Sequence, residues 1–417
     1  MTGCATSSMH NDIEAVKAQL LQKGVRILQP ESVFIDPAVT PARIAPGVVI
    51  HPGCRITGAQ TSIGPGCCLG AEAPVTLHDC CLGSAVSLQG GFFDQATLLN
   101  RANMGSGAHV RPGTLIEEEA GGAHTVGLKQ TILLPFVTLG SLINFCDCLM
   151  AGGTSRSNHS EVGSSYIHFN YTPHQDKATP SLIGNVPDGV MLNQSPIFLG
   201  GQGGLVGPAC ITYGVVIPAG IIARGDIRQP GLFTPDMTPP HPTREYRPGR
   251  YRKISRIVAN NLRYIGNIIA LRGWYGHIRA PVMSADPFQQ ACLQSARAGL
   301  NAILEERLRQ MDKLSEKMPA SLELHGVHPD RAAASNDPEI AGQFRLHRRW
   351  PEMRGQLIQL AETPWPKDCR EVLGREWPPA GQEDYIDMVR TMPAAAAAAA
   401  RRAMQQVIAT ATGLWPA

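Results

Sequence analysis

Three histidines in one polar segment could act as a base at neutral pH. His159, His168 and His174 lie close together in the sequence, and an imidazole changes its charge near neutrality. Transfer of an acyl group to an amine or hydroxyl needs such a group to remove the proton. We take His159 as the first candidate for the catalytic base, because Asn158 and Glu161 are near enough to orient its ring.

His168 is the second candidate for the base. It alternates with Ile167 and Phe169 in a strand-like pattern, so we expect its side chain to point out of the strand into a groove. Taken alone, each of these histidines is more often a satisfied hydrogen-bonding residue. The polar and aromatic residues that follow favour a functional cluster. Those that could bind a substrate are Asn170, Tyr171, His174 and Lys177.

Two cationic side chains in an earlier part of the repeat region could hold an anion. Arg111 can bind a phosphate or carboxylate with two parallel hydrogen bonds, and Lys129 can add a point charge. An arginine at a chain corner can equally well bond a backbone carbonyl. The glutamate run 117–119 is expected to form a solvated corner.

The segment Gly200–Gly204 is richer in glycine than an ordinary repeat. Gly201 and Gly203 would allow close backbone approach of a cofactor or of another coil. No Lys-Ser or Lys-Thr pair follows, so this segment is not a Walker phosphate loop.

The cysteines and histidines do not predict a metal site. The chain has 11 cysteines and no Cys-x-x-Cys pair, which is typical of small buried side chains in a reducing cytoplasm. The histidine spacings do not place a pair on one strand, as a zinc site between subunits would require.

Small aliphatic residues recur every six residues over long stretches. One run contains Ile44, Ile50 and Ile56, and the last begins at Leu199, with Gly or Pro-Gly often between members. This period is typical of short strands that turn a corner every six residues, so that three faces close one triangular coil. The sequence therefore predicts a mainly β protein, a left-handed parallel β-helix. The period breaks within residues 152–196, and such insertions often lie on the binding face.

The chain divides into four parts on this interpretation. The helix expected over residues 11–23 would cover the open end of the solenoid. The predicted parts are an N-terminal helical cap (1–31), the β-helix (32–227), a Pro-rich linker (228–249) and a C-terminal helical region (250–417).

The C-terminal region has the period of amphipathic helices. We expect it to contact another chain or to cover a neighbouring solenoid. Its first apolar stripe consists of Ile254, Val258, Ile265, Ile268, Ile269 and Leu271. Basic residues flank this stripe and are expected to form a solvated face: Arg252, Lys253, Arg256, Arg263 and Arg272.

The overall composition narrows the classes of partner. A net charge of +3 gives no case for nucleic acid. No apolar run reaches the roughly 20 residues of a membrane span, and no signal peptide is evident at the N-terminus. We therefore expect a cytoplasmic protein without a membrane or nucleic-acid partner.

Three stretches resemble the acetyltransferase domain of the bifunctional bacterial enzyme glucosamine-1-phosphate acetyltransferase / N-acetylglucosamine-1-phosphate uridyltransferase. Residues 110–115 are similar to its Arg-Pro-Gly corner, residues 126–129 to its following Lys strand, and residues 167–184 to its Asn-Tyr loop. The resemblance implies that Arg111 and Lys129 bind a sugar phosphate, and that the Asn-Tyr loop contacts the sugar and acetyl-CoA.

Some positions depart from the pattern of this family. Its catalytic histidine falls in a Gly-His-Leu triplet, where this chain has Ser141 between Gly140 and Leu142. A tyrosine three residues on is replaced by Asn144, which remains a candidate for substrate binding, and a lysine of the Asn-Tyr loop is displaced by one position to Lys177. We find no Gly-x-Gly-Thr-Arg loop near the N-terminus and expect no nucleotidyltransferase domain.

The resemblance implies an acyltransferase-like protein that acts on or binds a sugar phosphate or sugar nucleotide. Acetyl-CoA would be the donor, and the protein would be a homotrimer. Two alternatives stay open: a catalytically degenerate sugar-nucleotide-binding protein, favoured by Ser141 and Asn144, and a structural assembly protein.

Overall fold

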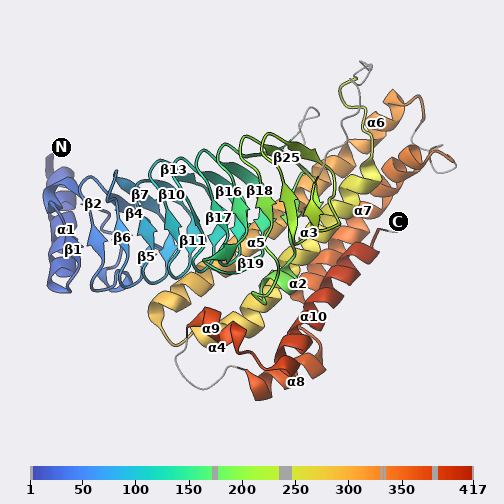
Figure 1. The fold of residues 1–417 in the computed structure, drawn as a ribbon. Coiled ribbons are helices and arrows are strands. Elements are labelled where there is room, and N and C mark those ends of the chain that lie inside the picture. Colours follow the sequence, from blue (N-terminus) through green and yellow to red (C-terminus); the bar gives the residue numbers. More distant parts are fainter. Residues whose placement is uncertain are drawn as a thin grey trace.

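The chain winds into a parallel β-solenoid of about eleven turns, and helices run along one side of it (Figure 1). This computed structural model describes residues 3–170, 177–233, 247–328, 332, 335–377 and 384–415. The predicted parallel β-helix, with a short N-terminal helix and a C-terminal helical region, is confirmed. No helix among the described residues is long and apolar enough to cross a membrane.

The solenoid has three faces, and neighbouring strands on each face are parallel. Strands β16 (Gly127–Leu133) and β18 (Asn144–Met150) run through the corner between the second and third faces and belong to both. The first face comprises β1 (Arg26–Ile27), β3 (Val49–Ile50), β6 (Cys68–Leu69), β9 (Ser87–Leu88), β12 (Asn103–Met104), β15 (Gly121–Gly122), β17 (Thr138–Leu139), β21 (Glu161–Val162), β24 (Phe198–Leu199), β27 (Val215–Ile217) and β29 (Gly231–Leu232). The second comprises β2 (Phe34–Ile35), β4 (Arg55–Thr57), β7 (Val75–His78), β10 (Gly91–Asp94), β13 (Ala108–Val110), β16 (Gly127–Leu133), β18 (Asn144–Met150), β22 (Ile167–Phe169), β25 (Gly204–Val206) and β28 (Ile222–Arg224). The third comprises β5 (Ser62–Ile63), β8 (Cys81–Leu82), β11 (Ala96–Leu98), β14 (Thr114–Ile116), the ends of β16 and β18, β23 (Ser181–Ile183) and β26 (Cys210–Ile211).

Inward side chains of successive turns stack in ladders that fill the solenoid. On the first face, Ile50, Leu69 and Leu88 occupy equivalent positions in paired strands, and all three are fully buried. Burying each such side chain contributes roughly 1.5–3 kcal/mol. The six-residue aliphatic period thus marks the inward residue of each face.

Glycines at the corners supply the backbone geometry that the turns need. Most Pro-Gly steps that interrupt the aliphatic period have a glycine with φ between 73° and 78°, a left-handed conformation that other residues rarely adopt. The corner glycines of this kind are Gly47, Gly53, Gly66 and Gly113, and Gly220, which follows Ala219, has the same conformation.

Helix α1 (Gly3–Gln22) covers the N-terminal end of the solenoid, as predicted (Figure 1). Leu20 of this helix is fully buried, and Lys17 donates a hydrogen bond of 2.8 Å to the carbonyl of Pro30. At the other end, β29 continues the first face into the predicted linker, most of which lies outside the described residues.

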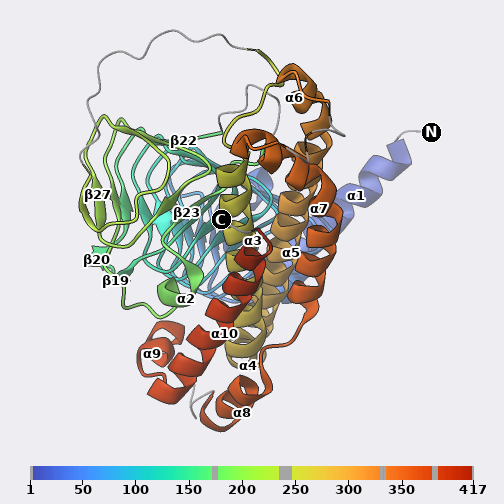
Figure 2. The ribbon, with the colours of Figure 1, turned by 90° about the vertical axis from the view of Figure 1, so that its right-hand side faces the viewer.

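The C-terminal region forms a bundle of helices on one side of the solenoid (Figure 2). A π-helical turn, Tyr275–Arg279, follows α3 directly. A short helix α2 (Val186–Gly189) belongs to the solenoid part, and β19 (Gly153–Ser155) with β20 (Asn158–His159) forms a small hairpin there. The remaining helices are α3 (Ile254–Trp274), α4 (Ala280–Met283), α5 (Pro287–Glu316), α6 (Met318–Leu324), α7 (Pro338–Glu362), α8 (Lys367–Glu376), α9 (Tyr385–Arg390) and α10 (Ala394–Gly413).

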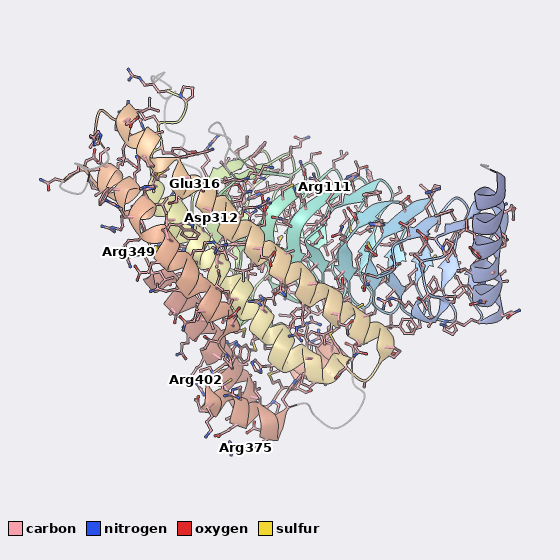
Figure 3. The ribbon with its side chains drawn as sticks, turned by 180° about the vertical axis from the view of Figure 1, so that it is seen from behind. Arg111, Asp312, Glu316, Arg349, Arg375 and Arg402 are labelled. Atoms are coloured by element: carbon pink, nitrogen blue, oxygen red, sulfur yellow. The ribbon has the colours of Figure 1, made fainter. Side chains whose placement is uncertain are left out.

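Helix α5 packs against strands β5, β8, β11 and β14 of the third face, and α3 packs against β23 (Figure 3). The apolar stripe predicted for α3 is buried in the same continuous core as the solenoid ladders. We expected these helices to contact another chain or to cover a neighbouring solenoid. Their apolar faces cover the third face of their own solenoid, and contact with another chain stays a prediction.

A buried charge cluster joins the helices to the solenoid. Glu117 and Glu118 are 1% and 2% exposed, and both accept hydrogen bonds of 2.7–2.8 Å from Arg279 on the π-helical turn. Tyr275 donates a further bond of 2.7 Å to Glu117. The prediction of a solvated glutamate corner is therefore wrong for these two residues, because their partner lies about 160 residues away in sequence.

Candidate functional site

A row of polar side chains crosses the outward side of the second face over three successive turns. In the pairing of β16 with β18, Gly127 lies beside Asn144 and Lys129 beside Cys146. Arg111 follows β13 in the preceding turn, on the solenoid next to the helices (Figure 3). The alternate residues of these strands point into the core, so the outward ones form a surface strip.

Arg111 and Lys129 share one end of this strip. The Nη2 atom of Arg111 lies 3.6 Å from the Sγ atom of Cys146. Burial raises the pKa of the Cys146 thiol and Asp147 adds to this, while the positive charges of Arg111 and Lys129 act in the opposite direction. Within the described residues, no carboxylate forms an ion pair with either cation. The two charges are therefore placed to attract an anion together.

A histidine that the sequence interpretation missed lies at the other end of the strip, at the edge between the first and second faces. His124 and Ser141 follow β15 and β17 in consecutive turns, and the Nδ1 atom of His124 lies 2.9 Å from the Oγ atom of Ser141. Their separation of 17 residues equals the register that pairs Gly121 with Thr138. An imidazole from the preceding turn therefore stands beside the position where the resembling family has its catalytic histidine.

The strip thus has the imidazole of His124 at one end and the cations Arg111 and Lys129 at the other. Ser141 and Cys146 are five positions apart, which corresponds to at most about 16 Å of extended backbone at about 3.3 Å per residue, and the chain turns a corner at Leu142 (φ 61°) before β18 begins at Asn144. Asn144 lies exposed between the two ends. Long side chains at both ends shorten the gap, so the geometry suits an elongated ligand with an anionic group at the Arg111 end.

His168 lies in the core, and its predicted outward orientation is wrong. Its side chain is 3% exposed, and its Nε2 atom lies 2.7 Å from the Oγ atom of Ser181. Burial disfavours the charged imidazolium and lowers the pKa of His168 to about 4. Its neighbours Ile167 and Phe169 point outward instead, so a substrate on the surface does not reach this ring.

His159 lies on a different edge of the solenoid from the strip. It ends the β19–β20 hairpin between the third and first faces, where its Nδ1 atom lies 2.7 Å from the carbonyl of Arg156. Its Nε2 atom is 3.8 Å from a carboxylate oxygen of Glu161, in agreement with the expected orienting contact. Asn158 bonds Thr154 rather than the ring. Its role as the base stays a prediction.

Asn170 belongs to a polar network behind the cationic end of the strip. It donates a hydrogen bond of 3.1 Å to Asp147 and accepts one of 2.9 Å from Thr179. Arg307 of α5, which is 1% exposed, binds the other oxygen of Asp147 at 2.8 Å and the carbonyl of Lys177 at 3.1 Å. These contacts anchor the start and end of the Asn-Tyr loop.

The Asn-Tyr loop also contains the three remaining candidates for substrate binding. Tyr171 and His174 lie outside the described residues. The side chain of Lys177 is exposed, and its backbone is fixed by Arg307. Sequence reasoning missed Arg307, because nothing in α5 indicates which solenoid turn it faces.

Gly201 and Gly203 lie at the same edge of the solenoid as Ser141, two turns further along the chain. A β-carbon on Gly203 would lie 2.7 Å from the carbonyl oxygen of Gly200 and 2.8 Å from that of Ile221. One on Gly201 would lie 2.9 Å from the carbonyl oxygen of Ser164. Close packing between coils, one of the two expected causes, accounts for these glycines.

The chain is similar to known proteins over about half of its length, although no family model matches it. It is 28% identical over 215 residues to the Bifunctional protein GlmU of Trichlorobacter lovleyi, covering 51% of this chain and 42% of that protein. The resemblance indicated by the sequence motifs is confirmed. The Bifunctional protein GlmU of Thermus thermophilus is 30% identical over 160 residues, covering 38% of this chain and 33% of that protein. The chain thus spans less than half of the length of these relatives.

Proposed function

We propose that this protein transfers an acetyl group from acetyl-CoA to the amine or hydroxyl of a sugar phosphate or sugar nucleotide, as in the formation of UDP-N-acetylglucosamine. One observation carries the proposal. The His124–Ser141 pair and the Arg111–Lys129 pair lie at opposite ends of one exposed strip, with Asn144 between them.

The reaction needs a base whose side chain is already held in the correct orientation. The contact with Ser141 fixes the His124 ring through Nδ1 and leaves Nε2 on the exposed side. As the acceptor nitrogen or oxygen forms its bond to the thioester carbon, Nε2 takes the proton. The carbon–sulfur bond then breaks, and the proton passes to the CoA sulfur. Acetylated sugar and free CoA are the products.

The cationic end of the strip positions the acceptor. Arg111 can bind a phosphate oxygen pair bidentately, and Lys129 adds a second positive charge. The resembling family uses the corresponding residues for a sugar phosphate, which supports the same assignment here. Asn144 would bond a sugar hydroxyl midway along the strip.

We propose a homotrimer, because apolar side chains remain exposed on the faces that the helices do not cover. Phe198, Val216 and Leu232 form one outward column on the first face, and Ile167 and Ile222 lie outward on the second. Contact between copies would bury both sets. Light scattering coupled to gel filtration measures the mass directly, and a monomer would refute this part of the proposal.

The test of activity is release of CoA from acetyl-CoA in the presence of glucosamine-1-phosphate. Because the chain itself has 11 cysteines, each thiol measurement needs a blank without acceptor. Turnover that requires the acceptor and is lost in Arg111→Gln supports the proposal. Binding of the sugar phosphate without turnover would replace it by the sugar-binding alternative, which Ser141 favoured.

A further inference from the structure

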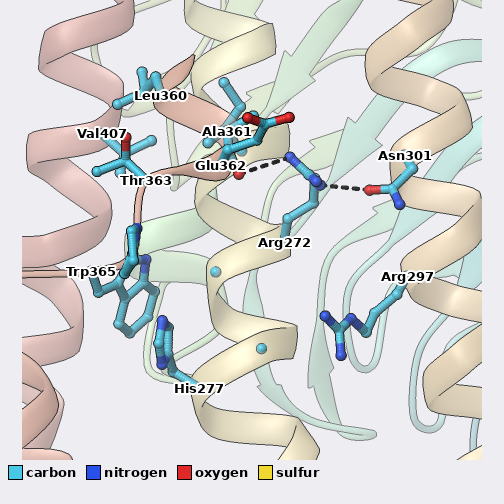
Figure 4. A pocket seen from close by; sticks show the side chains of 14 residues that line it. Arg272, His277, Arg297, Asn301, Leu360, Ala361, Glu362, Thr363, Trp365 and Val407 are labelled. Carbon is cyan, nitrogen blue, oxygen red and sulfur yellow. Dashed lines mark hydrogen bonds between the residues drawn. The ribbon is translucent and has the colours of Figure 1, made fainter. Parts of the chain in front are cut away.

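A cavity lies within the helical region, away from the polar strip. It has a volume of about 210 Å³ and opens between α3, α5, the segment that joins α7 to α8, and α10 (Figure 4). Its lining combines the apolar side chains of Ile269, Leu360 and Val407 with cationic ones. None of the residues of the strip contributes to it.

Two arginines from facing helices extend into this cavity. Arg272 of α3 donates hydrogen bonds of 2.7 Å to the side-chain oxygen of Asn301 and 3.2 Å to the carbonyl of Ala361. Both acceptors are neutral, so the charge of Arg272 is not neutralised by them. Burial and the nearby charge of Arg297 both lower the pKa of Arg272. The two guanidinium groups are therefore close enough for their positive charges to repel each other (Figure 4).

Arg297 of α5 has no hydrogen-bond or ion-pair partner among the described residues. Glu362 also lines the cavity and, with Glu305, attracts Arg272. Neither carboxylate lies within ion-pair distance of Arg272 or Arg297 in the described part of the chain. The lining therefore carries two guanidinium groups against one carboxylate, an excess of positive charge that a bound anion would neutralise.

The wall of the cavity is built from unusual backbone. The π-helical turn Tyr275–Arg279 forms one side, and π-helical turns occur often at functional sites. A β-carbon on Gly276 would meet nothing within 4 Å, whereas one on Gly273 would overlap the indole of Trp365. The Trp365 ring in turn stacks on His277, with 4.8 Å between ring centroids. Aromatic surface thus lies next to the two cations.

We propose that this cavity binds a compact organic anion, with its phosphate or carboxylate group between Arg272 and Arg297 and its carbon skeleton against Trp365. A guanidinium group can donate two parallel hydrogen bonds to two oxygens of either head group. The volume of 210 Å³ is below the roughly 300–1,000 Å³ of most ligand pockets, so a nucleotide is too large.

Calorimetric titration with inorganic phosphate and with acetate, at constant ionic strength set by chloride, tests this site. The titrations use a chain with both Arg111→Gln and Lys129→Gln, so that the strip no longer offers a pair of cations to the anion. We expect saturable binding of at least one anion, and the preferred anion identifies the head group. Absence of binding by both would overturn the proposal, independently of any acetyl transfer.

Arg297→Gln locates the site without endangering the fold, because the side chain is exposed and unpaired among the described residues. Loss of its charge-assisted hydrogen bonds should weaken binding by about tenfold or more. Arg309→Gln removes an exposed charge from the same helix and is the matched control. Equal affinity in Arg297→Gln and Arg309→Gln would overturn the proposal.

Discussion

Replacement of Arg279 by methionine tests whether a buried charge cluster holds the helices on the solenoid. Methionine keeps much of the side-chain volume but removes all three hydrogen bonds to Glu117 and Glu118. Two buried carboxylates then lose their cation. Breaking a buried pair in this way costs about 3–5 kcal/mol, a large share of the roughly 5–15 kcal/mol that stabilise an ordinary domain.

The pH dependence gives this variant a second signature. Burial raises the pKa of Glu117 to about 7, although Arg279 acts against it. The folded protein therefore keeps a proton that the unfolded chain releases above its ordinary pKa of 4.5, and stability falls as pH rises from 4.5 to 7. Without the positive charge of Arg279, the pKa of Glu117 should rise further. The difference in unfolding free energy between wild type and variant should then grow by about 1.4 kcal/mol per pH unit as pH rises above 7.

Urea unfolding followed by far-ultraviolet circular dichroism at several pH values between 7 and 9 measures this difference. Arg101→Met is the matched control. Arg101 also bridges the solenoid to the helices, through Glu119 and Asp384, but it is exposed, so its loss should cost less than about 1 kcal/mol. A pH-independent difference for Arg279→Met, or one no larger than that of the control, would refute the reasoning.

The remaining predictions concern the strip and the buried histidine. Arg111→Gln or Lys129→Gln should lower kcat/KM for a sugar phosphate by about tenfold or more, with little change in unfolding free energy; equal loss for an uncharged acceptor would contradict a phosphate role. His124→Ala should reduce kcat by about 100-fold and His159→Ala by much less, and the reverse order would move the base to His159. Because the pKa of His168 is lowered to about 4, the stability of wild type relative to His168→Gln should fall by about 3 kcal/mol as pH falls from 6.5 to 4; parallel acid-unfolding curves of the two chains would argue against this burial effect.

The fold could be predicted from the sequence because the geometry of a solenoid requires an apolar residue at every sixth position. Each sixth residue faces the interior, as Ile50 and Leu69 do, and each corner needs a residue such as Gly53 with positive φ. These constraints act within one turn and need no knowledge of distant residues. The N-terminal cap and the α3 stripe were predictable for the same reason.

The candidate site was predictable only where its residues lie at equivalent positions of neighbouring turns. Arg111 and Lys129 follow the period, whereas the alternation around His168 was assigned to the wrong side because its outward neighbours are apolar. The contacts of Glu117 and of Asp147 with helices over 150 residues away depend on docking, which no local pattern encodes.

Acceptor-dependent release of CoA from acetyl-CoA, measured on wild type and on His124→Ala with glucosamine-1-phosphate, tests the central claim most directly. The account predicts turnover by wild type that falls by about 100-fold in the variant, while both chains bind the sugar phosphate equally. Absence of acceptor-dependent turnover in wild type, or equal turnover by both chains, would contradict it.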